Sequence, residues 1–161
     1  MNDTMTRTGT EDRRLQPVDA FRSDGTDVWH EDDDRTRVRG FFPLTPGMPH
    51  ASDVAGSDLT IVCMEIDPDH YLPIHRDDTE ELFLVTAGAI EATIGEETIE
   101  LGTEECAVIP ENVPHRVRND GDEVARAVSF FPSTELSATF EKPLMPFGEA
   151  EITIRPDADA Q

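Results

Sequence analysis

The stretch ELFLVTAGAIEATIGEETIEL (Glu81–Leu101) contains three short segments rich in Val, Ile, Thr and Phe, separated by glycine-containing turns. In the middle segment, Ile90, Ala92 and Ile94 alternate with Glu and Thr. Alternation with a period of two places the apolar side chains on one face of an extended chain. The stretch therefore predicts consecutive antiparallel strands, each with one buried face and one wet face.

Segments of the same kind occur on both sides of this stretch. They are LTIVCMEI before it, and CAVIP, HRVRN and VARAVSFF after it. Seven such segments with no helical pattern between them indicate an all-β fold, an antiparallel sandwich or barrel. Apolar residues concentrate between about Leu59 and Phe131, so we expect the core there.

The chain has 161 residues, which is room for one domain. Residues 1–35 are polar and charged without sustained periodicity, and we expect them to form an acidic arm that is extended or disordered. We place a single barrel at residues 36–148. Residues 149–161 are then a C-terminal tail.

The chain carries a net charge of −22, from 35 acidic and 13 basic residues, and Lys142 is its only lysine. This composition resembles that of salt-in halophiles, where molar salt screens the self-repulsion. A negative surface argues against nucleic acid and against an anionic membrane, because both need a basic face. The N-terminus lacks the apolar core of a signal peptide, and no window reaches the roughly 18 apolar residues of a membrane span. We expect a cytoplasmic protein.

Four residues stand out as a candidate site. Residues two apart in a strand share a face, so His75 and Asp77 project together if their segment is extended. Glu81 shares a side of the next strand with apolar residues, so it is either exposed at the strand end or held inside by a cation. His115 follows a proline-punctuated turn and starts a strand in which we expect it to point inward.

The spacing of these residues resembles the two motifs of the cupins, G-x5-H-x-H-x3/4-E-x6-G and G-x5-P-x-G-x2-H-x3-N. At the first motif the chain has Asp69 in place of the opening glycine, then His75, Asp77 in place of the second histidine, Glu81 and Gly88. At the second it has Glu104 in place of the opening glycine, then Pro110, Asn112 in place of the inner glycine, His115 and Asn119. The resemblance covers roughly residues 59–131 and implies a jelly-roll β-barrel.

The resemblance also implies a divalent metal ion inside the barrel, which most metal-binding cupins hold through three histidines and the glutamate. The expected ligands here are His75, Glu81 and His115, with Asp77 either a fourth ligand or a group behind the ligands. Two imidazoles with one or two carboxylates suit Fe(II), Mn(II), Ni(II) or Zn(II). Neutral imidazoles and ionised carboxylates are available near pH 7, so we expect binding to release few protons. The alternative is a cupin that has lost its metal.

The first functional hypothesis is a metal-dependent dioxygenase of quercetinase-like type. A site of two histidines and carboxylate leaves coordination positions at which a substrate and dioxygen can bind side by side. Glu81 would serve as a ligand and as the base that takes a substrate proton. Phe83, Val85 and Val117 share the inward faces of their strands, and we expect them to line the substrate cavity.

Two alternatives remain open. His75 and Asp77 with the distant His115 have the form of the facial triad of 2-oxoglutarate-dependent iron oxygenases, and Arg126 stands near where those enzymes tend to place an arginine. The other alternative is a non-catalytic cupin that binds or senses a small metabolite. In every case the expected partner is a small molecule, and we expect a homodimer that protects the edge strands.

Overall fold

The computed structural model describes residues 16–21 and 24–156, and these residues form strands, turns and loops without a helix. The strands are β1 (Thr26–His30), β2 (Asp33–Phe41), β3 (Thr60–Ile66), β4 (Tyr71–Asp77), β5 (Glu81–Ala87), β6 (Ile90–Ile94), β7 (Glu97–Leu101), β8 (Cys106–Ile109), β9 (His115–Arg118), β10 (Ala125–Phe131), β11 (Leu136–Leu144) and β12 (Glu149–Ile154). The predicted all-β fold is confirmed. Within the described residues there is accordingly no helix that could cross a membrane.

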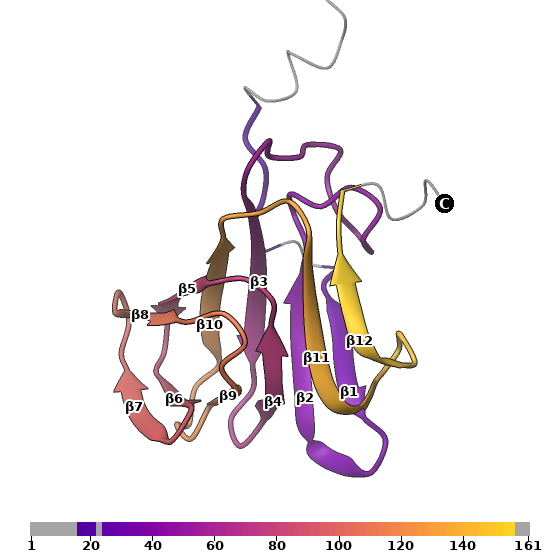
Figure 1. Cartoon of the computed structure of the whole chain (residues 1–161). Helices are drawn as coiled ribbons and strands as arrows, with labels where there is room; N and C mark the ends of the chain where they lie inside the picture. The colour runs from indigo at the N-terminus through magenta and orange to yellow at the C-terminus, as the bar shows by residue number, and fades with distance from the viewer. Residues whose placement is uncertain (1–15, 22–23, 157–161) are drawn as a thin grey trace, which may run out of the picture.

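The strands curl into a jelly-roll barrel (Figure 1). Hydrogen bonds order nine of them as β7-β6-β9-β4-β2-β3-β10-β5-β8. Strand β1 pairs with β2, and β11 pairs with both β12 and β4. The C-terminal half of β4 therefore lies between β9 and β11, and this position brings residues of three distant segments together.

Alternation along the strands builds the interior. In β5 the side chains of Glu81, Phe83 and Val85 are buried, whereas Leu82 between them is exposed. The same period of two holds in β4, β9 and β10, and the inward apolar side chains form one continuous core. Removal of this apolar surface from water is the main driving force for folding.

The barrel begins earlier and ends later than we predicted. Strand β1 and the start of β2 lie within the expected arm of residues 1–35, and β12 lies within the expected tail of residues 149–161. Residues 1–15, 22–23 and 157–161 are outside the described residues. Strands β1 and β12 are short and have charged neighbours, so that only their pairing with β2 and β11 reveals them as part of the barrel.

Backbone geometry supports the alignment with both motifs. Asp69, Glu104 and Asn112 stand where the motifs have glycine, and their φ angles are 65°, 72° and 60°. Gly88, which matches a motif glycine directly, has a φ of 72°. This left-handed region is open to glycine and costs other residues roughly 1–2 kcal/mol. The turns have therefore kept the conformation of the motif although three of its glycines are replaced.

Asn119, the last residue of the second motif, has a structural role. Its Nδ2 donates to the carbonyl oxygens of Ile66, at 2.8 Å, and Glu123, at 2.6 Å. Its Oδ1 accepts from the backbone N–H of Gly121 at 3.0 Å. Because the side chain is buried and satisfied on both sides, it ties the turn after β9 to the end of β3.

Candidate metal centre

His75 and His115 face each other across two antiparallel strands. Strands β4 and β9 pair with His75 directly opposite His115, both side chains are buried, and the ring centroids are 4.2 Å apart. On its other side His75 is opposite Phe140 of β11, and the two rings stack at 4.8 Å with 18° between their planes. The register of the sheet therefore fixes the position of both imidazoles.

A backbone carbonyl orients each ring. Nδ1 of His75 lies 2.8 Å from the carbonyl oxygen of Pro73, and Nδ1 of His115 lies 2.9 Å from that of Val113. A carbonyl oxygen only accepts, so each Nδ1 must carry its proton and donate. Nε2 is then the atom that each ring offers to the site, which is the arrangement that orients metal-binding histidines.

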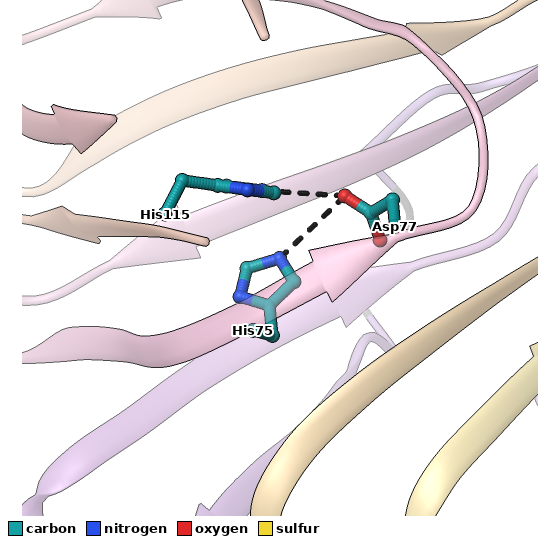
Figure 2. Close-up of side chains that lie close together, drawn as sticks. All are labelled: His75, Asp77 and His115. Atoms are coloured by element: carbon teal, nitrogen blue, oxygen red, sulfur yellow. Dashed lines mark ion pairs between the residues drawn. The ribbon is translucent and has the colours of Figure 1, made fainter. Parts of the chain in front are cut away.

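Two buried carboxylates approach these Nε2 atoms. Oδ2 of Asp77 lies 3.2 Å from Nε2 of His115 and 3.8 Å from Nε2 of His75, and Figure 2 shows both rings directed at this oxygen. Oε2 of Glu81 lies 3.5 Å from Nε2 of His115. The other oxygen of Glu81, Oε1, accepts a hydrogen bond of 2.8 Å from the buried hydroxyl of Ser129 on β10. Four strands thus contribute to one site.

The four ionisable groups shift one another's pKa values. Burial lowers the pKa of His75 to about 4, and the nearby His115 adds to that shift. Burial raises the pKa of Glu81, and the neighbouring Asp77 carboxylate acts in the same direction. Burial opposes the charged forms of His115 and Asp77, but their contact outweighs it: the pKa of His115 rises to about 10 and that of Asp77 falls below its usual range. Without metal, a neutral His75 therefore lies beside a charged pair.

The donor atoms fit a divalent metal ion. Oδ2 of Asp77, Oε2 of Glu81 and Nε2 of His115 are buried without a hydrogen-bond partner of acceptable geometry, which is costly in a protein interior. One atom each from His75, Asp77 and His115 lies within 4.8 Å of the others, a separation that one ion can span. Imidazole nitrogen with carboxylate oxygen suits the borderline to hard divalent ions. The predicted residues His75, Asp77, Glu81 and His115 thus lie together.

A cavity of about 90 Å³ lies beside these groups. The four ionisable residues and Ser129 line part of it. The rest of the lining is almost wholly apolar and includes the side chains of Phe42, Phe83, Phe131, Phe140 and Phe147. The barrel therefore combines a small group of polar donors with an aromatic and aliphatic chamber.

Sequence comparison agrees with this geometry, because a family model described as a cupin domain matches residues 62–131. This segment, which holds both motifs and all four candidate ligands, is a cupin domain. Among curated proteins, none matches the sequence significantly.

Solved structures share the cupin fold at low identity. A provisionally assigned sugar phosphate isomerase from Acidithiobacillus ferrooxidans has a TM-score of 0.56 at 16% identity, over 84% of this chain and 81% of its own. The polyketide cyclase RemF from Streptomyces resistomycificus has a TM-score of 0.56 at 16% identity, over 73% and 80%. The Cnp3 cupin domain from Schizosaccharomyces pombe has a TM-score of 0.50 at 13% identity, over 60% and 64%. Similarity at this level shows the fold alone.

One of the three predicted cavity-lining residues lies elsewhere in this cupin domain. Phe83 and Val117 line the cavity as expected, but Val85 does not. Val85 is buried in the hydrophobic core on the same face of β5 as Phe83, two residues farther along the strand from Glu81. Arg126 is exposed on the outside of β10, where its Nε donates to Glu65 at 3.3 Å and its guanidinium lies over the ring of Phe21. It therefore cannot anchor a substrate in the cavity, and the facial-triad hypothesis rests on His75, Asp77 and His115 alone.

The cupin motifs contain neither Ser129 nor Phe140, although both touch the site. Ser129 holds the carboxylate of Glu81, and Phe140 stacks on His75. Strand parity supplies a signal for Ser129, because it shares the inward face of β10 with Ala127 and Phe131. No such signal singles out Phe140, whose partner lies on a strand 65 residues earlier and is set by the pairing of β11 with β4.

Proposed function

We propose that this cupin is a divalent-metal-dependent oxidoreductase, specifically a small-molecule dioxygenase of quercetinase-like chemistry. The observation that carries the proposal is the convergence of four buried donors at the edge of an apolar cavity. Structural groups in a protein core rarely leave several polar atoms unpaired, so such a convergence points to a ligand.

His75, Asp77, Glu81 and His115 would hold the ion. We assign Asp77 as a direct ligand, because its Oδ2 approaches both imidazole Nε2 atoms, at 3.2 and 3.8 Å. When bound, a redox-active divalent ion would polarise the substrate and provide the electron transfer to dioxygen that an organic side chain cannot.

Glu81 is the residue we assign to proton transfer. The hydroxyl of Ser129 holds Oε1, which leaves Oε2 facing the site. Burial raises the pKa of Glu81 above that of an ordinary carboxyl, and this brings it closer to the range in which a group both accepts and returns a proton. A substrate hydroxyl that is bound beside the four donor side chains would therefore lose its proton to Oε2 of Glu81, in a cavity whose apolar walls exclude water.

The volume of the cavity limits the size of the substrate. Pockets that bind drug-sized ligands are about 300–1,000 Å³ in volume, whereas this one is about 90 Å³. A molecule with the three rings of quercetin is too large for it. We therefore propose the reaction type of the quercetinase-like enzymes on a smaller substrate.

A second candidate function is a non-catalytic cupin that binds or senses a small metabolite. The observation that favours it is the pairing of His115 with Asp77 and Glu81, at 3.2 and 3.5 Å. This pairing gives each buried charge an opposite partner in the absence of metal, as a site without an ion would need.

Elemental analysis of the purified protein tests the metal site. We expect close to one divalent ion per chain, and strong loss of it in Glu81→Ala and His115→Ala. Glu80→Ala is the matched control, because Glu80 is the exposed neighbour of Glu81 and should leave the metal content unchanged. Substoichiometric metal that is the same in all four proteins would exclude the enzyme and leave the metabolite-binding candidate.

Oxygen consumption then tests the reaction type. A dioxygenase of the proposed kind consumes oxygen with its organic substrate alone. A dependence on 2-oxoglutarate would instead restore the facial-triad hypothesis, and oxygen consumption that is insensitive to every added small apolar hydroxyl compound would contradict the proposal.

A further inference from the structure

Polar groups occupy only one part of the cavity wall. Apart from Cys63, the side chains that can donate or accept a hydrogen bond there are His75, Asp77, Glu81, His115 and Ser129. The thiol of Cys63 is neutral, since burial raises its pKa to about 12. A ligand can therefore make polar contacts at one end only, and the rest of it must lie against aromatic and aliphatic side chains.

No arginine or lysine from residues 16–21 or 24–156 lines the cavity. The basic residues nearest to the site in sequence are turned away from it. Arg76 is exposed, Arg116 lies with its guanidinium 5.5 Å from the ring centre of Tyr71, and Arg126 pairs with Glu65 on the outer surface. A carboxylate, sulfate or phosphate on the far end of a ligand would thus be buried without a cationic partner.

The replacement of histidine by Asp77 removes a second source of attraction for anions. Three imidazoles and one carboxylate around a divalent ion leave one positive charge, whereas two imidazoles and two carboxylates leave none. The net charge of −22 on the whole chain adds a repulsive field for any anion that approaches. Neither the wall nor the donor group of this cavity offers a surplus positive charge.

We infer that the cavity selects compact apolar molecules with a single oxygen head group, such as a small phenol, enol or alcohol, and rejects molecules that carry a second, anionic group. The inference rests on the proposed function for the position of the head group at His75, Asp77, Glu81 and His115. The rejection of a second charge rests on the lining alone. Burial of an unpaired carboxylate should weaken binding at least about 100-fold relative to an apolar group of the same size.

The test compares 4-ethylphenol with 4-hydroxybenzoate at pH 7.5. The two probes have the same ring and hydroxyl and similar length, but only the second carries a carboxylate. Binding is measured by calorimetry on the metal-free protein, and by the visible spectrum of the Co(II)-loaded protein, so that neither readout needs turnover. We expect 4-ethylphenol to bind at least about 100-fold more tightly in both forms.

A variant tests the contribution of Asp77. In the Co(II)-loaded protein, Asp77→His restores one positive charge at the site. A unit charge about 6 Å from the head group should make azide and other small anions bind about 10- to 100-fold more tightly than they bind to the unmodified protein. Asp78→His is the matched control, because Asp78 is exposed and its Oδ1 only accepts from the backbone N–H of Ser137. Asp78→His should bind these small anions as the unmodified protein does.

The outcomes separate the inference from the proposed function. If the protein takes up no metal but the metal-free form still prefers 4-ethylphenol, the proposed function fails and the selection stands. If metal binds and 4-hydroxybenzoate binds as tightly as 4-ethylphenol, the proposed function stands and the inference is overturned. If neither probe binds, the inference is overturned as well.

Discussion

In the metal-free protein, His115 should carry a proton that a metal ion must displace. Its Nδ1 donates to the carbonyl oxygen of Val113, so Nε2 is the only nitrogen that a metal can reach. The carboxylate of Asp77, 3.2 Å away, and that of Glu81, 3.5 Å away, favour the protonated ring against the effect of burial. They raise its pKa to about 10. Proton and metal therefore compete for one atom.

The size of this competition follows from the pKa. Each pH unit below the pKa costs about 1.4 kcal/mol for removal of the proton, so the cost at pH 7 is about 4 kcal/mol. The apparent affinity for metal should therefore rise about tenfold per pH unit between pH 7 and 9, and at pH 7 it should be about 1,000-fold below its limit at high pH. The sequence led us to expect little proton release. The structure reverses that expectation, because the carboxylates that would help to hold a metal ion also favour the proton on His115.

Calorimetric titration with Mn(II) at several pH values, in pairs of buffers with different ionisation enthalpies, measures the released protons directly. We expect at least one proton per ion at pH 7.5, since His115 must release one and any proton on Glu81 adds to the count. Asp77→Asn should lower the pKa of His115 and reduce the release, while the exposed Asp78→Asn should not. An affinity that changes less than twofold between pH 7 and 8.5, with no proton released, would refute the reasoning.

Four further predictions follow from particular contacts. Ser129→Ala should leave Oε1 of Glu81 buried without a donor and lower the free energy of unfolding by about 1–3 kcal/mol, while Ser129→Thr should restore most of it in urea titrations. Glu104→Gly should raise the free energy of unfolding by about 1 kcal/mol, because glycine adopts the φ of 72° without strain; a loss in the same titrations would contradict this. The pKa of His75 is 6.5 in the unfolded chain and about 4 in the folded protein, so its contribution to the free energy of unfolding is complete above pH 6.5 and is lost as the pH falls through 4. Acid unfolding of the metal-free protein should therefore show a loss of about 3 kcal/mol over this window, and His75→Phe should abolish it. The unfolding temperature should rise steeply from low to molar salt because salt screens the net charge of −22, and a flat response would count against a halophilic adaptation.

Local pattern was enough to predict the central part of the barrel and to propose the residues of its candidate site. The period of two puts His75 and Asp77 on one face of β4 and turns His115 of β9 inward, while it left Glu81 either exposed or interior. In the structure all four side chains are buried. Side-chain direction along a strand is a local property of an extended chain, so it can be inferred without knowledge of the partners. The motif spacing then identified which inward residues belong together.

Pairing between distant strands decided what the pattern could not. The sequence by itself determined the all-β class, the inward faces of the central strands and a set of four candidate donors, in which the role of Asp77 stayed open. Only the tertiary structure decided that β1 and β12 belong to the barrel, that Arg126 lies outside it, and that Ser129 holds Glu81 across 48 positions of the chain. It also decided the protonation of His115, because the pKa depends on the approach of Asp77 and Glu81 to within a few ångströms. Strand order and register set such distances, and no property of a single segment determines them.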